Sequence, residues 1–85
     1  MPNFSSHFLY LNFMKYTKSQ ALMYLIIELF EHKILYKSDC LDVLEIDDNR
    51  FHHYMQDIRA FLTNFNKRYE LKYIKQYDRY ELIEE

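Results

Sequence analysis

A helical repeat of apolar residues dominates the stretch from residue 49 to residue 62. Four apolar side chains recur at i, i+4, i+7 and i+11, which is the spacing of one stripe along an α-helix. They are Phe51, Met55, Ile58 and Leu62. At about 100° per residue, the opposite face carries Asn49, His53, Gln56 and Ala60. The pattern predicts a helix over residues 49–62, with a buried stripe and a polar outer face, which short acceptor side chains at residues 47–49 can cap.

Nearer the N-terminus, the segment that follows residue 16 is predicted to be an unusually apolar helix. Thr17 and Gln20 have the spacing of a capping box, in which each side chain bonds the other's backbone N–H, so the helix begins at Thr17. Because the helix is apolar on nearly all sides, both of its faces need a cover. One face belongs to the domain core. For the other face we expect either the apolar segment of residues 1–16 or a second copy of the chain.

Three shorter features complete the predicted order of elements. Residues 34–36 are a brief apolar run that favours a short strand, and Ser38 is expected to cap a second helix. Residues 45–47 are expected to make a tight turn. From residue 69 to residue 83 the apolar period changes to two, which predicts a hairpin of two half-buried strands. The side chains expected to cover the core there are Tyr69, Leu71, Tyr73, Tyr80 and Leu82.

This order of elements, mainly α with a small β-hairpin, resembles the winged helix-turn-helix domain of the DeoR-type transcriptional regulators. Six residues stand where that family places its apolar anchors: Leu41, Leu44, Ile46, Phe51, Met55 and Ile58. Two further segments resemble patterns of that family. Asp57-Ile58-Arg59 resembles its helix-end pattern, and Arg79-Tyr80-Glu81-Leu82 resembles its wing-end pattern. The resemblance covers roughly Lys18 to Ile83.

The resemblance implies a winged helix-turn-helix domain over residues 17–85, with three helices, a C-terminal wing and an extra apolar segment at residues 1–16. It implies that the helix at residues 49–62 lies in the major groove of double-stranded DNA. It also implies that the hairpin at residues 69–83 contacts the DNA backbone or the minor groove. The chain departs from the family in two respects: Glu45 stands where the turn usually has glycine, and the second helix is acidic.

Charge is distributed unevenly along the chain. The net charge of the 85 residues is −2, which by itself argues against nucleic acid. However, residues 49–80 carry seven basic and three acidic side chains, whereas residues 38–48 carry five acidic side chains and no basic one. A chain with one basic segment is compatible with a nucleic-acid-binding face.

Composition narrows the class of protein further. A chain of 85 residues is expected to form one domain. It contains no glycine, which excludes glycine-rich phosphate-binding loops, and its single cysteine excludes an internal disulfide. The longest apolar run, residues 21–30, is too short to span a bilayer, and no signal peptide is recognisable. These features predict a cytoplasmic protein without a membrane segment.

Candidate binding residues lie on the outer face of the third helix and on the hairpin. Asn and Gln can pair bidentately with adenine and Arg with guanine, and His can contact bases or phosphates. The helix offers Asn49, Arg50, His52, His53 and Gln56. Long cationic side chains on the hairpin can contact phosphates, and these are Lys72, Lys75 and Arg79. Each side chain could equally belong to a solvated surface.

Catalytic and metal chemistry are not expected. His53 and Asp57 have a metal-compatible i, i+4 spacing, but no third ligand accompanies them. Cys40 has no activating neighbours and is expected to be a small buried hydrophobe. The sequence therefore predicts no enzyme activity, no metal site and no cofactor.

Two functions remain. The first is a small, sequence-specific, DNA-binding transcriptional regulator that acts as a homodimer. The second is a protein-interaction module, in which the acidic segment of residues 38–48 docks on a basic protein partner such as a regulator or a polymerase, without binding DNA.

Overall fold

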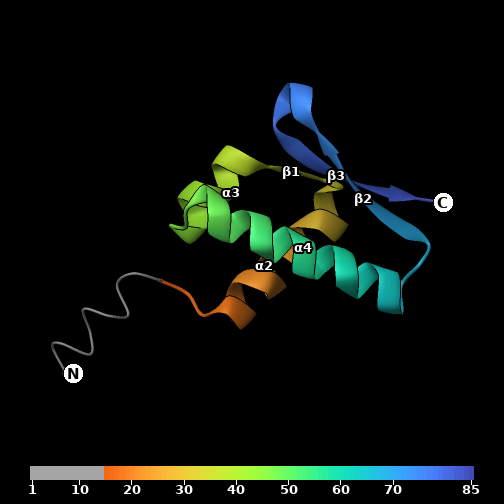
Figure 1. The fold of residues 1–85 in the computed structure, drawn as a ribbon, viewed down its shortest axis with the longest axis horizontal. Coiled ribbons are helices and arrows are strands. Elements are labelled where there is room, and N and C mark those ends of the chain that lie inside the picture. Colours follow the sequence, from red (N-terminus) through yellow and green to blue (C-terminus); the bar gives the residue numbers. More distant parts are fainter. Residues whose placement is uncertain (1–14) are drawn as a thin grey trace, which may run out of the picture.

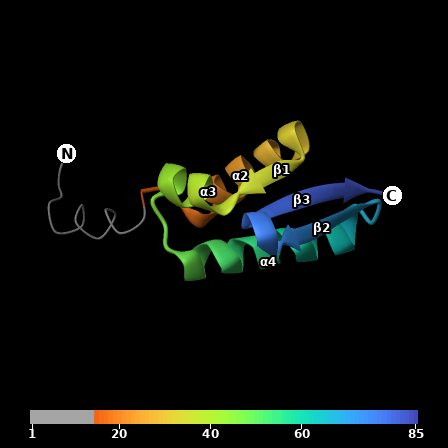
Figure 2. The same ribbon diagram turned by 90° about the horizontal axis from the view of Figure 1, so that it is seen from above.

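The computed structural model describes residues 15–85. Three helices pack against a small antiparallel sheet (Figures 1 and 2). The elements are α2 (Lys18–His32), β1 (Ile34–Tyr36), α3 (Lys37–Leu44), α4 (Asp48–Phe65), β2 (Tyr69–Ile74), the 3-10 turn η1 (Lys75–Tyr77) and β3 (Arg79–Glu84). The described chain is therefore mainly helical and belongs to the α+β class, as predicted. Of the N-terminal segment expected at residues 1–16, residues 1–14 lie outside the described part.

Helix α2 begins where the capping box predicts. The Thr17 hydroxyl accepts a hydrogen bond from the Gln20 N–H over 3.1 Å, and the Gln20 side chain accepts one from the Thr17 N–H over 3.2 Å. The helix ends at His32, and the C-cap residue Lys33 is left-handed at φ 66° and donates its N–H to the Leu29 carbonyl. Ala21, Leu25 and Leu29 are the buried residues of this helix.

The start of α3 differs from the prediction. Ser38 was expected to cap the helix, but Tyr36 is the N-cap residue and Ser38 lies in the first turn. The cause is tertiary. Pairing of Tyr36 with Arg79 in β3 keeps the chain extended up to residue 36, and the Lys37 N–H then donates to the Asp78 carbonyl over 3.1 Å. The hairpin thus accepts the hydrogen bond of one of the N–H groups at the start of α3 that have no partner within the helix.

The turn between α3 and α4 has the expected tight geometry. Glu45 is left-handed at φ 54° and ψ 52°, a conformation that costs a residue with a Cβ about 1 kcal/mol. Ile46 packs partly buried against the core, as expected. The Asp47 carboxylate then caps α4 by accepting a hydrogen bond from the Arg50 N–H over 2.8 Å.

The predicted apolar stripe of α4 forms the centre of the core. All four stripe residues, Phe51, Met55, Ile58 and Leu62, are no more than 2% exposed. Leu25 and Leu29 of α2 belong to the same cluster. Tyr54 is also buried, which the stripe did not predict, and the helix continues to Phe65. Among the described residues, no helix is long and apolar enough to cross a membrane.

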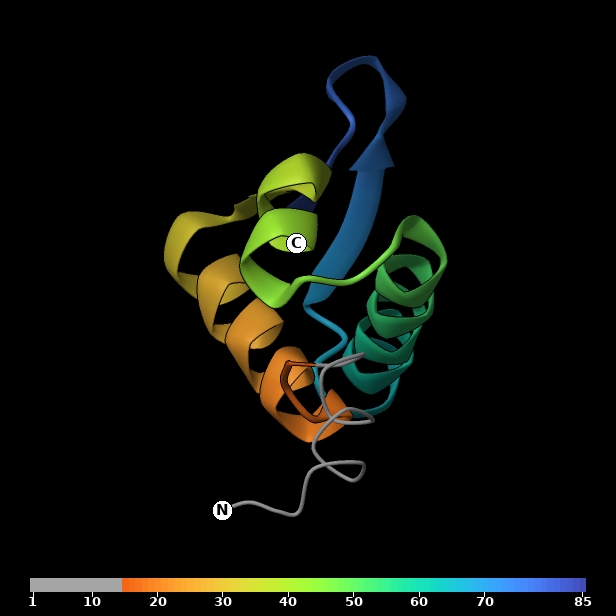
Figure 3. The same cartoon turned by 90° about the vertical axis from the view of Figure 1, so that its left-hand side faces the viewer.

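The sheet has the strand order β1-β3-β2, and both pairings are antiparallel. Leu35, Leu71, Tyr80 and Leu82 are its buried residues. Tyr73 was expected to cover the core, but its side chain is 41% exposed. Tyr73 lies near the tip of the hairpin, which projects beyond the helices (Figure 3), so its ring packs on that of Tyr80, with 5.0 Å between the ring centres, but is only partly covered.

Candidate nucleic-acid interface

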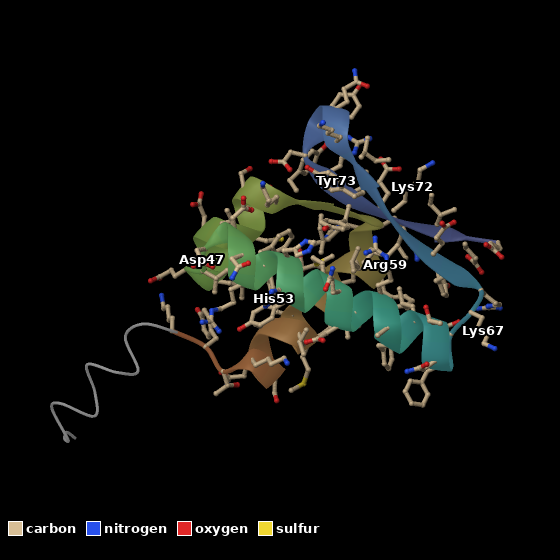
Figure 4. All side chains as sticks on the ribbon, viewed as in Figure 1. Asp47, His53, Arg59, Lys67, Lys72 and Tyr73 are labelled. Carbon is tan, nitrogen blue, oxygen red and sulfur yellow. The ribbon has the colours of Figure 1, made fainter. Side chains whose placement is uncertain are left out.

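The outer face of α4 presents the polar residues that the sequence predicted. Asn49, Arg50, His52, His53 and Gln56 are all exposed. The Gln56 amide donates a hydrogen bond to His52 Nε2 over 3.1 Å. The two residues are one helical turn apart, and this hydrogen bond restrains both side chains. In Figure 4, α4 crosses the front of the molecule, with His53 in its N-terminal half and Arg59 between α4 and β2. The exposed, polar side of α4 is thus bordered by the hairpin.

A groove of about 620 Å³ separates α4 from the hairpin. Its buried apolar lining consists of Phe51 and Tyr80, whose rings pack edge to face with 5.8 Å between their centres. Polar side chains from α3, α4 and β2 complete the lining: Lys37, Asp48, Asn49, His52, Arg59 and Tyr73. The groove therefore combines two residues predicted to bind DNA, Asn49 and His52, with others that were not predicted.

A network of ionic groups ties the hairpin to the start of α4. Lys37 Nζ lies 3.0 Å from Asp48 Oδ1 and 3.2 Å from Asp78 Oδ2. The Tyr73 hydroxyl donates to the other oxygen of Asp78. The hydrogen bond from Tyr73, followed by Lys37, lowers the pKa of Asp78, and the hydrogen bonds to Asp48 and Asp78 raise the pKa of Lys37. The charge of Lys37 is thus compensated, and the network serves to hold the hairpin in place.

The three predicted hairpin cations have different environments. Lys72 and Lys75 are exposed, and within residues 15–85 neither forms an ion pair. Arg79, in contrast, lies 2.6 Å from Glu81 and donates to the Tyr36 hydroxyl over 3.0 Å. Its guanidinium also lies 4.5 Å from the centre of the Tyr77 ring. Arg79 is therefore engaged within the protein, which leaves Lys72 and Lys75 as the available cations of the hairpin.

Four polar residues of the groove were missed as binding residues by sequence reasoning: Lys37, Asp48, Arg59 and Tyr73. For Arg59 a signal was present, because Arg59 follows His52 by seven residues and so lies on the same side of a helix. In the structure its Nη2 donates to the Leu71 carbonyl of β2 over 2.9 Å. Nothing local in the sequence pointed to Lys37, because its partners lie 11 and 41 residues away.

The acidic segment of residues 38–48 is partly compensated. Besides Asp48, which pairs with Lys37, Glu45 lies 2.9 Å from Lys15. Asp47 caps α4. Asp39 and Asp42 are exposed on α3, and within the described residues neither forms an ion pair. A residual negative surface therefore remains on α3, next to the start of α4.

The residues considered for metal binding and nucleophilic chemistry are placed elsewhere. Asp57, weighed as a metal-binding partner of His53, instead lies 3.0 Å from Lys18. Cys40 is buried, as expected, and burial raises the pKa of its thiol to about 12, so it stays protonated at neutral pH. Glu28, Glu31 and His32 are a separate, mostly exposed group at the end of α2, with His32 Nε2 3.7 Å from Glu28 and 3.9 Å from Glu31.

Comparison of the chain with protein-family models, with curated proteins and with solved structures finds no match. Functional inference therefore depends on the geometry and chemistry of the chain itself.

Proposed function

We propose that the protein is a small, sequence-specific, DNA-binding transcriptional regulator of the winged helix-turn-helix type. The observation that carries the proposal is the exposed polar face of α4, bordered on one side by a projecting hairpin. The hairpin carries Lys72 and Lys75, which form no ion pair with any other residue from 15 to 85. In this proposal α4 enters the major groove and the hairpin contacts the DNA backbone. The protein acts in the cytoplasm, where it meets its DNA.

The order and arrangement of the elements support this proposal. A helix, a short strand, two helices and a hairpin succeed one another, and the short strand pairs with the last strand. The order of these elements is the order on which the resemblance to DeoR-type regulators rests. The major groove is about 12 Å wide, which admits one α-helix with its side chains.

The chemistry of the α4 face supports selective contact with bases. Asn49 and Gln56 carry amides that can donate to and accept from one base edge at the same time, and Arg50 offers a fork of donors. The hydrogen bond between Gln56 and His52 limits the freedom of both side chains before DNA binds. Less conformational entropy is then lost on binding than for two free side chains.

We propose further that the regulator is a homodimer. Met23 and Ile27 on α2 are 58% and 55% exposed, and Phe65 at the end of α4 is 76% exposed. Sedimentation equilibrium at tens of micromolar should give twice the mass of one chain, because burial of these apolar side chains favours association. Ile27→Lys should shift the equilibrium toward monomer, since a charge would then have to be buried. A wild-type monomer at that concentration would contradict the proposal.

The second candidate is a protein-interaction module, which the exposed Asp39 and Asp42 on α3 favour. In this proposal the acidic surface binds a basic region of a regulator or a polymerase, and no DNA is contacted. The two candidates differ in one measurable property, namely binding to a DNA duplex at low salt.

Binding to genomic and random-sequence duplexes at several salt concentrations tests the DNA proposal. Lys72→Ala/Lys75→Ala should weaken binding to all sequences alike, because phosphate contacts carry no sequence information. If both lysines contact phosphates, the slope of log affinity against log salt should fall by about two.

The matched control is Lys33→Ala, which also removes a lysine. Lys33 is the C-cap residue of α2, and its Nζ lies 5.5 Å from the centres of the Phe30 and Tyr69 rings. Its loss should leave the salt slope unchanged. If the wild-type protein binds no duplex even at low salt, the DNA proposal fails and the interaction module replaces it.

A further inference from the structure

Arg59 occupies a special position between α4 and β2. It lines the groove described above, and it also lines a second groove of about 370 Å³ that continues along the same helix. Besides Arg59, the polar side chains that line the second groove are Thr63 of α4, Lys67 just after α4, Glu70 on β2 and Glu85 after β3. Arg59 is thus exposed and lines both grooves, and Figure 4 shows it between α4 and β2.

The guanidinium of Arg59 is held in place without being neutralised. One N–H, on Nη2, donates to the Leu71 carbonyl. Within residues 15–85, Arg59 forms no ion pair with a carboxylate. A guanidinium has five N–H donors, so four remain for a ligand. A planar donor group of this kind, anchored at one atom, is suited to bidentate binding of a phosphate.

Distance separates Arg59 from the acidic start of α4. Asp48 is eleven residues earlier, which corresponds to about 16 Å along a helix. The Debye length at physiological ionic strength is about 8 Å, so repulsion of a phosphate by Asp47 and Asp48 is largely screened at Arg59. Lys37, the other cation of the groove, is compensated by Asp48 and Asp78. With respect to the described residues, Arg59 is therefore the uncompensated cation of the groove between α4 and the hairpin.

We propose that Arg59 binds a phosphodiester group of the DNA backbone in the groove between α4 and β2. This inference rests on the proposed function and adds a binding residue to it. It locates one backbone contact midway along α4, away from the acidic surface on α3. The carbonyl of Leu71 orients the side chain, so β2 contributes to phosphate binding through its backbone as well as through Lys72.

The test compares Arg59→Gln and Arg59→Lys with wild type on specific and random duplexes. Arg59→Gln should lower the salt slope by about one and weaken binding to both duplexes alike. Arg59→Lys should keep the slope but bind more weakly than wild type, because lysine retains the charge without the bidentate fork. The control is Arg68→Gln, which removes an arginine outside both grooves that lies 3.7 Å from Glu84.

Urea unfolding of each variant separates binding from structural support. A purely structural role would lower the unfolding midpoint of Arg59→Gln while leaving the salt slope as in wild type, and that result would overturn the inference. If wild type binds duplexes but Arg59→Gln and Arg68→Gln have the same slope, Arg59 contacts no phosphate and the proposed function still stands. If wild type binds no duplex, both the proposed function and this inference fail.

Discussion

Replacement of Ile58 by alanine is expected to lower the free energy of unfolding by about 2–5 kcal/mol. Ile58 is 2% exposed and belongs to the cluster that joins the α4 stripe to Leu25 and Leu29 of α2. Its loss removes apolar contacts and leaves a cavity that the packed neighbours only partly fill. A single domain of this size has a total stability of only about 5–15 kcal/mol, so the change should be large in urea or thermal unfolding.

The control for this prediction is Ile83→Ala. Ile83 lies on β3 and is 36% exposed, so the same deletion of side-chain carbons there should cost less than about 1 kcal/mol. If Ile58→Ala and Ile83→Ala shift the unfolding midpoint equally, the assignment of the buried face of α4 is wrong.

The second large effect is expected in sequence discrimination. Replacement of Gln56 by alanine should cost roughly 1–3 kcal/mol of binding at a single base-pair position and relax the preference there. The reason is that a bidentate amide contact specifies one base, whereas its loss leaves intact the contacts of residues other than its neighbour His52. His52, which accepts the hydrogen bond from Gln56, should then be less well oriented, so its own contact should weaken too. Competition binding against a library of singly substituted sites measures both effects.

Gln76→Ala is the matched control, because it removes the same side chain from the 3-10 turn at the tip of the hairpin. It should leave the base preference of the protein unchanged. A loss of discrimination in Gln76→Ala but not in Gln56→Ala would place the reading of bases on the hairpin and would contradict the role proposed for α4.

Features that depend on neighbours along the chain could be predicted. The capping box at Thr17 and the cap at Asp47 each join residues three positions apart, and the apolar stripe of α4 repeats over successive turns. The alternation of residues 69–83 likewise predicted a hairpin, observed as two strands over residues 69–74 and 79–84. Each of these patterns arises from the geometry of a single helix or strand, so the sequence contains all the information needed.

Features that join distant segments could not be predicted in this way. Ser38 matched the local pattern of a helix cap, yet the carbonyl of Asp78, 41 residues from Lys37, accepts the hydrogen bond that sets the start of α3. Arg79 resembled a free cation, but the register of the sheet brings Tyr36, 43 residues away in the chain, beside its guanidinium.

The same distinction between local and distant features applies to the candidate site. The amino-acid sequence by itself determined the polar face of α4, because that face is simply the side of the helix opposite its buried stripe. Only the tertiary structure decided which cations border it, since Lys37 and Arg59 reach the groove through packing of α4 against the sheet. The reason is that helical period is a local property, whereas the partner of a long charged side chain depends on which elements pack together.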